Sequence, residues 1–153
     1  MPMGESLKHR HASVLLAGRY SGLVEGIRGL LAARFKGIFI VGDDVSLLQG
    51  AERMRPALVV IDLSLGSDDV LGRIAEVRAC VPETRIVVLS VHDDATIAHA
   101  VFAAGADGVV LKRAIATDLL AAVDAVEQGR KYVSADVRSS TGSHEALQAG
   151  LRA

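Results

Sequence analysis

The chain has 153 residues, half of them hydrophobic and 23 % charged, with a formal net charge of -1. This size and composition are typical of one globular domain with a substantial core. The charge argues against a protein that binds DNA regardless of sequence, which needs a basic face. The one cysteine, Cys80, excludes an intramolecular disulfide and a thiolate metal cage. No apolar run reaches membrane-spanning length and no signal peptide is recognisable, so we expect a cytoplasmic protein.

Taken in chain order, short apolar runs alternate with longer segments of helical periodicity. The runs are rich in Val, Ile and Leu on both faces, as in the central strands of a parallel sheet. In the longer segments, apolar residues recur at spacings of three and four, which predicts amphipathic helices. Gly129 closes the last of them and is a typical helix stop. The predicted strands are Ser13–Ala17, Gly37–Val41, Ala57–Ile61, Arg85–Leu89 and Gly108–Leu111.

Five strands that alternate with five helices predict an α/β fold. We expect a doubly wound five-stranded parallel sheet, a (βα)5 flavodoxin-like domain with helices on both faces. We assign this domain to residues 13–137. The polar stretch 1–12 is expected to be a disordered N-terminal tail, and residues 138–153 to be a linker or a short C-terminal helix.

Polar residues stand at the carboxyl ends of the predicted strands, where doubly wound sheets bind their ligands. Asp62 ends the third strand, Ser90 the fourth and Lys112 the fifth, and Gly18 and Arg19 follow the first. A carboxylate beside a core is costly unless it is satisfied. Asp62 is therefore a reactive group, a ligand or a cap for the next turn. The convergence of one acid, one hydroxyl and two cations favours a functional role.

Four segments together resemble the receiver domain of response regulators, most closely the NarL/FixJ (LuxR-type) class. They read VVIDLSL, RIVVLSVHDD, AGADGVVLK and EQGRKYVSADV, and the likeness covers residues 13–137. In that family an Asp at the place of Asp62 accepts a phosphoryl group from a sensor histidine kinase. The resemblance implies that Ser90 turns towards the new phosphate and that Lys112 pairs with it. Such a transfer needs a carboxylate nucleophile and cations around the phosphoryl oxygens.

The chain departs from the family at the metal site. Where the family usually has two adjacent acids, as in LLADDH, this sequence reads LLAGRY, so Gly18 and Arg19 replace both. Mg²⁺ needs carboxylate oxygens, so we expect no tightly held cofactor and weak Mg²⁺ binding at most, even with an oxygen from Asp68 or Asp69. In one hypothesis Arg19 is a metal-substituting cation that pairs with Asp62. In the alternative, Arg19 points to solvent.

A second departure concerns the residue that reports activation in the family. That position is often a tyrosine that moves inward together with the hydroxyl residue, and here it is Val109. Valine is too small for this movement. The resemblance therefore argues against the usual output switch in this chain.

Two functions remain open at this stage. One is an aspartyl-phosphate acceptor in two-component (phosphorelay) signalling, including the regulatory part of a transcriptional regulator; Asp62, Ser90 and Lys112 favour it. The other is a pseudo-receiver, a protein–protein interaction or dimerisation module without phosphoryl transfer, which Gly18 and Arg19 favour. We favour the receiver role and, within it, action independent of phosphorylation. No catalytic triad follows from the spacing of Ser, His, Asp and Cys, so we expect no enzyme.

The expected partners are proteins. They are a sensor histidine kinase or another signalling protein, together with a second copy of the chain. Ala121, Ala122 and Ala125 make the last predicted helix rich in small residues that allow close approach. We therefore expect a weak homodimer that forms without phosphate. We expect no direct binding of this segment to nucleic acid or membrane.

Overall fold

The computed structural model describes residues 12–65 and 69–140, with side chains up to Val137. The predicted tail, apart from Ala12, and residues 141–153 lie outside the described residues, as does Asp68. Helix α7, Ala135–Ser140, ends within the stretch that the sequence assigns to the linker or short C-terminal helix.

Six parallel strands form one sheet, in the order β2-β1-β3-β4-β5-β6. The strands are β1 (Ser13–Ala17), β2 (Gly37–Val41), β3 (Leu58–Asp62), β4 (Arg85–Ser90), β5 (Gly108–Leu111) and β6 (Tyr132–Val133). They are connected by α2 (Ser21–Leu31), α3 (Asp44–Met54), α4 (Val70–Cys80), α5 (Ala95–Ala104), the short 3₁₀ helix η1 (Lys112–Ala114) and α6 (Ile115–Glu127). The predicted doubly wound parallel fold is confirmed.

The sixth strand was not predicted from the sequence. β6 has two residues, Tyr132 and Val133, which pair in parallel with Gly108 and Val109 of β5. A two-residue strand is too short to show an alternating pattern, and its pairing depends on β5 lying beside it. β3 begins and ends one residue later than predicted, and β4 ends one residue later, so that Asp62 and Ser90 are the last residues of their strands.

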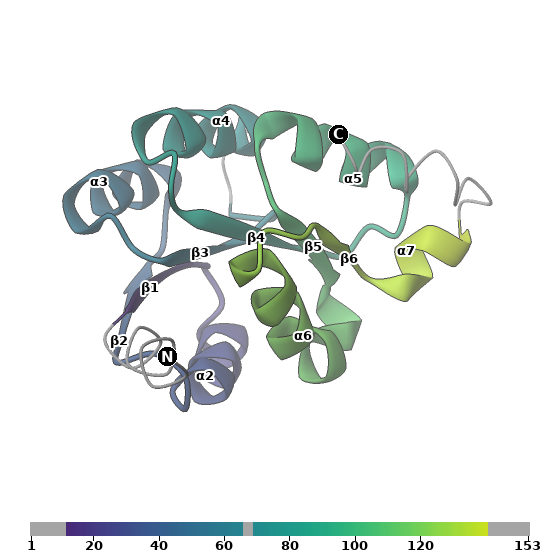
Figure 1. The fold of residues 1–153 in the computed structure, drawn as a ribbon, viewed down its shortest axis with the longest axis horizontal. Helices are drawn as coiled ribbons and strands as arrows, with labels where there is room; N and C mark the ends of the chain where they lie inside the picture. The colour runs from purple at the N-terminus through teal and green to yellow at the C-terminus, as the bar shows by residue number, and fades with distance from the viewer. Residues whose placement is uncertain (1–11, 66–68, 141–153) are drawn as a thin grey trace.

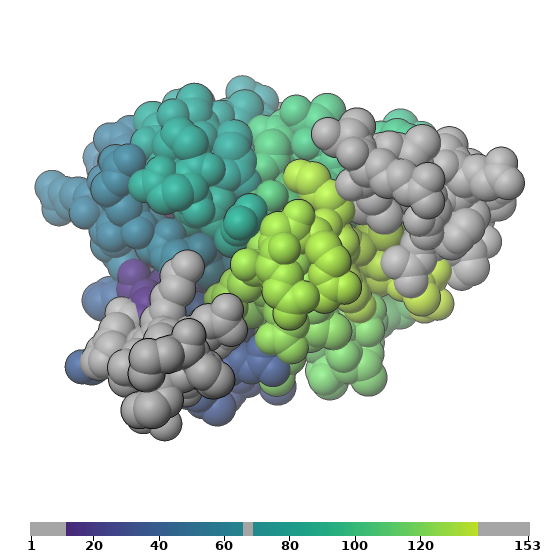
Figure 2. All heavy atoms as spheres, in the orientation of Figure 1, coloured from purple at the N-terminus to yellow at the C-terminus, as the bar shows by residue number. Residues whose placement is uncertain are grey.

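Helices cover both faces of the sheet (Figure 1). α3, α4 and α5 lie on one face and α2 and α6 on the other. Each face has its own apolar cluster, and the residues of β3 alternate between the two clusters. Figure 2 shows that atoms of the yellow-green segment occupy the middle of the viewed face.

Two of the three alanines expected to form a contact surface are buried in the chain's own core. Ala122 is fully buried and Ala125 nearly so, whereas Ala121 is exposed. Small residues on α6 therefore allow close approach of the helix to its own sheet. The sequence-based reason for a dimer through this helix is wrong for Ala122 and Ala125.

An aspartate is the N-cap residue of each of α3, α4 and α5, the three helices on one face of the sheet. Asp43 accepts a hydrogen bond from the Ser46 N–H at the start of α3, and Asp94 accepts one from the Thr96 N–H at the start of α5. Asp69 accepts from the Gly72 N–H at the start of α4, at 3.0 Å. These bonds satisfy N–H groups that have no partner within the helix. They also assign Asp69 a structural role.

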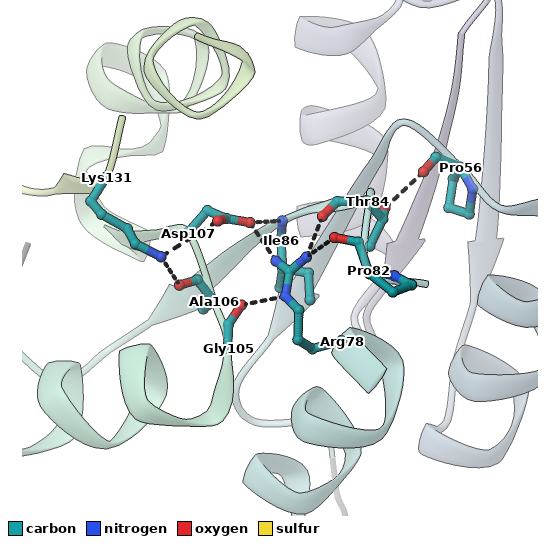
Figure 3. Close-up of polar contacts among 9 residues, drawn as sticks. All are labelled: Pro56, Arg78, Pro82, Thr84, Ile86, Gly105, Ala106, Asp107 and Lys131. Carbon is teal, nitrogen blue, oxygen red and sulfur yellow. Dashed lines mark hydrogen bonds and ion pairs between the residues drawn. The ribbon is translucent and has the colours of Figure 1, made fainter. Parts of the chain in front are cut away.

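At the amino-terminal edge of the sheet, Arg78 of α4 binds groups from several loops (Figure 3). Its guanidinium donates to the carbonyl oxygens of Gly105, Pro82 and Thr84 at 3.0, 2.9 and 2.7 Å, and it lies 2.6 Å from the Asp107 carboxylate. Gly105 has a φ of 118°, and a Cβ there would lie 2.9 Å from Arg78 Cγ. Glycine is needed at this position both for the backbone angle and for the close approach.

The Asp107 carboxylate connects the same network to the sheet (Figure 3). Asp107 Oδ2 also accepts from the Ile86 N–H at 2.8 Å, and its Oδ1 lies 3.5 Å from Lys131 Nζ. The Thr84 hydroxyl donates to the Pro56 carbonyl at 2.7 Å. The network therefore fastens the starts of β3, β4 and β5, at the edge opposite Asp62.

Candidate functional site

Asp62 lies at the carboxyl end of β3, beside the end of β1. The last paired residues of these two strands are Ala17 of β1 and Ile61 of β3, and Asp62 comes directly after this pair. β1 is also paired with β2, so the strand order reverses here, and this is where doubly wound sheets place their sites. Asp62 is only 1 % exposed. A carboxylate with so little access to water needs partners within the protein.

One oxygen of Asp62 has three donors. Oδ1 accepts from the Ser64 N–H at 2.9 Å and from the Ser64 hydroxyl at 2.8 Å, and Lys112 Nζ lies 2.7 Å away. Lys112 Nζ also donates to Ser64 Oγ at 3.0 Å. The sequence posed three roles for Asp62, and the contact with Ser64 N–H is that of a cap for the turn after β3. The ammonium is an additional partner that a cap does not need.

The second oxygen of Asp62 is different. Oδ2 is buried and has no hydrogen-bond partner within the part of the chain that the structure describes. A buried oxygen without a partner is costly. It is the atom of this site that remains able to take a cation or to attack an electrophile.

Ser90, the last residue of β4, is fully buried. Its hydroxyl oxygen accepts from the His92 N–H at 2.9 Å, and the hydroxyl lies 3.4 Å from the His92 carbonyl oxygen. In this arrangement the hydroxyl serves the turn that follows its own strand. Among the described residues, no hydrogen bond joins it to Asp62 or Lys112.

Lys112 reaches Asp62 from η1, at the end of β5. Its side chain is 18 % exposed, and its Nζ lies 6.0 Å from the centre of the Tyr20 ring. A cation near an aromatic face is attracted by the ring. The exposed Tyr20, just after β1, is therefore an aromatic neighbour of this ammonium.

The hypothetical ion pair between Arg19 and Asp62, one of the two alternatives from the sequence, is not formed in the structure. Arg19 is exposed, and within the described residues it has no ion pair or hydrogen bond. Lys112 is the cation that pairs with Asp62. Gly18 and Arg19 both follow β1, but the chain turns there, so Gly18 is buried and Arg19 faces solvent. The solvent-facing alternative for Arg19 is the one observed.

The residues at this edge do not fit a magnesium site well. Within the described residues, no group of three His, Cys, Asp or Glu side chains could hold a metal ion. Gly18 supplies no oxygen from a side chain, and the Asp69 carboxylate caps α4. Mg²⁺ prefers octahedral oxygen ligands that include carboxylates. Asp62 is the buried carboxylate at this edge, and one of its oxygens already faces an ammonium.

Ser64 is a site residue that sequence reasoning missed. It donates to Asp62 and accepts from Lys112. A signal was available, because a Ser two residues after an Asp at a strand end is a common partner in a turn closed by that Asp. Val109 lies in β5, the strand predicted for it, and is buried. Its carbonyl accepts a hydrogen bond from the Ser134 N–H at 3.1 Å.

The doubly wound parallel sheet has a buried acid at its switch point and a lysine at the end of β5, so the protein is a small α/β domain with its site at the carboxyl edge of the sheet. The family model of the response regulator receiver domain matches residues 21–124, more than half of the chain. This protein belongs to the response regulator receiver family.

Solved and curated relatives agree with this assignment. The transcriptional regulatory protein RcsB of Escherichia coli K12 is 27 % identical over 82 % of this chain and 60 % of its own length. A LuxR-family two-component response regulator from Aurantimonas sp. SI85-9A1 superposes with a TM-score of 0.79, at 24 % identity, over 89 % of this chain and 99 % of that one. A structure of two RcsB dimers bound to two parallel DNAs has a TM-score of 0.71 at 25 % identity, over 84 % of this chain and 66 % of that one.

The match covers only part of the curated relatives. This chain spans 56 % and 60 % of the lengths of two of them, which are transcriptional regulatory proteins. Among the described residues, no helix is both long enough and apolar enough to cross a membrane.

Proposed function

We propose that this receiver domain acts in two-component signalling without depending on phosphorylation. The observation that carries the proposal is the occupation of Asp62 Oδ1 by Lys112 and Ser64, at an edge where Gly18 and Arg19 stand in place of a pair of acids. The site is thus held in one arrangement by the protein's own cation. The curated relatives are transcriptional regulatory proteins, and we propose that this domain likewise belongs to a transcriptional regulator.

The physical reason is the charge that phosphoryl transfer develops. Catalysis of this transfer consists mainly of positioning and of cations that neutralise the phosphoryl oxygens. A metal supplies much of that charge. Lys112 alone provides one positive charge, and it is already paired with Asp62.

A second candidate function is the aspartyl-phosphate acceptor. It is favoured by the buried Asp62 Oδ2, which has no partner among the described residues, and by the ammonium of Lys112 beside the same carboxylate. In this version Oδ2 attacks the phosphorus of a phosphohistidine, an O–P bond forms as the P–N bond breaks, and the imidazole leaves. Lys112 pairs with the aspartyl phosphate, and Ser90 turns from His92 towards it. The partner is then a sensor histidine kinase.

Incubation with a small phosphodonor, followed by intact-mass measurement, separates the two candidates. We expect little or no added phosphoryl mass, with or without Mg²⁺, under conditions that label a receiver with both acids. Asp62→Asn is the control for the site of labelling. Rapid labelling of the parent that requires Mg²⁺ and disappears in Asp62→Asn would establish the acceptor function instead.

The metal site should be recoverable by substitution. A Cβ at Gly18 would lie 4.0 Å from Asp62 Cβ and 3.0 Å from Val24 Cγ2, so a side chain there reaches the site after a small shift of Val24. We expect Gly18→Asp with Arg19→Asp to lower the free energy of unfolding by about 1–3 kcal/mol without metal, because the acid at position 18 stands beside the buried Asp62 and repels it. Mg²⁺ should restore the loss by binding the folded state, and labelling of Asp62 should rise.

The parent protein provides the reference for that experiment. Its own Mg²⁺ affinity is expected to be millimolar or weaker, on the order of -4 kcal/mol. Titration calorimetry measures both proteins, and Arg19→Ala controls for the loss of the cation alone. Saturation of the parent at tens of micromolar Mg²⁺ would contradict the degenerate site, whereas a double variant that gains nothing from Mg²⁺ would contradict the role of the missing acids.

A homodimer is the second part of the proposal. The RcsB structure named above contains dimers, and a receiver that acts without phosphorylation needs an interaction surface that is present at all times. We propose a weak homodimer that forms without phosphate.

A further inference from the structure

The outer edge of strand β2 is apolar and unpaired within the described residues, and Phe39 on it is exposed. β2 reads GIFIV and is the last strand of the sheet on its side, so within the described residues only β1 pairs with it. None of its five residues is fully buried, and Phe39 is 51 % exposed. Proteins usually protect such an edge with charges, proline or a bulge. Here the five residues contain neither a charge nor a proline.

The backbone of this edge has groups ready to pair. The Val41 carbonyl accepts from the Gly18 N–H at 3.0 Å, so Val41 directs its backbone groups towards β1. Successive residues of a strand direct theirs to opposite sides, and Ile38 and Ile40 therefore direct N–H and C=O outward. In the described part of the chain no strand meets them.

We propose that two copies of this chain pair antiparallel through their β2 strands, about a two-fold axis at Phe39. This names the surface of the homodimer proposed above and rests on that proposal. In this register Ile38 of one copy lies opposite Ile40 of the other, and the two exchange both N–H···O bonds. The two Phe39 residues face each other as a close pair without hydrogen bonds, an arrangement that favours contact between aromatic side chains.

The same register matches the surroundings of Phe39. A Cβ on Gly37 would lie 2.9 Å from Phe39 Cε2, so the ring extends along its own strand over Gly37. Gly37 is opposite Val41 of the second copy, which is partly buried on the same face of the sheet. Each ring therefore meets an apolar side chain of the other copy.

Charge favours the antiparallel direction. Lys36 precedes β2 and is exposed, with no ion pair within the described residues, and Asp43 follows the strand and is exposed. Two antiparallel copies bring Lys36 of one next to Asp43 of the other, on both sides of the axis. Two parallel copies would instead bring like charges together, which is destabilising.

Cross-linking tests the register directly. In a Cys80→Ser background, Phe39→Cys should give a disulfide-linked dimer under mild oxidation, because close pairs of this kind have Cα atoms about 4.5 Å apart, within the range that a disulfide spans. The native thiol is removed because it is exposed. Val91→Cys, at another exposed apolar residue, is the matched control and should remain monomeric under the same conditions.

The dimer should also respond to charge at the edge. Phe39→Lys places two like charges opposite each other and should weaken dimerisation at least about tenfold, and Lys36→Glu should weaken it less and in a salt-dependent manner. Val91→Lys should leave it unchanged. Light scattering from micromolar to millimolar protein measures all of them. If Phe39→Lys still dimerises, the pairing through β2 is wrong, but the proposed homodimer stands. If the parent protein is monomeric at every concentration, both proposals are wrong, whatever the phosphodonor experiment shows.

Discussion

Replacing Lys112 by Met is expected to lower the free energy of unfolding by about 3–5 kcal/mol, the usual cost of removing one partner from a buried ion pair. Asp62 would remain almost without access to water, with Ser64 as its donor at Oδ1 and no partner at Oδ2 among the described residues. Urea denaturation measures the loss. Met keeps most of the volume of the lysine stem, so the change reports mainly the lost charge.

Two further variants separate the ion pair from the packing. Asp62→Asn in the Lys112→Met background should recover most of the loss, because a neutral amide needs no counter-charge and its oxygen can still accept from the Ser64 N–H. Ser64→Ala alone should cost only about 1 kcal/mol, the net worth of a typical hydrogen bond. If Lys112→Met is as stable as the parent, then the pair at the site contributes nothing to the fold, and the picture of a site locked by its own cation fails.

Arg78→Ala should be the most damaging substitution away from the candidate site. It removes the ion pair with Asp107 and leaves the carbonyl oxygens of Gly105 and Thr84 without that donor, at a place where the side chains are largely buried. We expect a loss of about 3–5 kcal/mol in the free energy of unfolding. Arg78→Lys should recover only part of it, since an ammonium cannot reach several acceptors in the geometry of a guanidinium.

The matched control is an arginine in an exposed ion pair. Arg28 lies 3.8 Å from Glu25 on α2, and both side chains are largely exposed. Arg28→Ala should change stability by less than about 1 kcal/mol, as is usual for surface pairs. Equal effects of Arg78→Ala and Arg28→Ala in urea denaturation would show that the loops at the amino-terminal edge do not depend on the network.

The sequence by itself determined the architecture and the principal acid. Buried parallel strands read as continuous runs of Val, Ile and Leu, and β1, β2 and β5 have the bounds that their runs predict. Parallel strands end at a common edge, so Asp62 and Lys112 were expected together, and their side chains lie 2.7 Å apart. Both inferences depend on local pattern and on the general geometry of such sheets.

Only the tertiary structure decided which groups pair at that edge. Arg19 and Lys112 are both cations at strand ends, and the sequence does not tell which one points inward. The turn after β1 buries Gly18 and exposes Arg19, whereas η1 directs Lys112 to Asp62 and Ser64. The direction of a side chain after a strand depends on the turn and on the packing around it, and these are set by residues far apart in the chain.

The same reason explains β6, the burial of Ala122 and the network around Arg78. β6 exists because β5 offers a free edge, and Ala122 is buried because α6 packs against the sheet. The acceptors of Arg78 come from the loops before β4 and β5, which are close only in the folded protein. A short strand, a small residue and an arginine carry little pattern of their own, so their roles follow from the neighbours that the fold gives them.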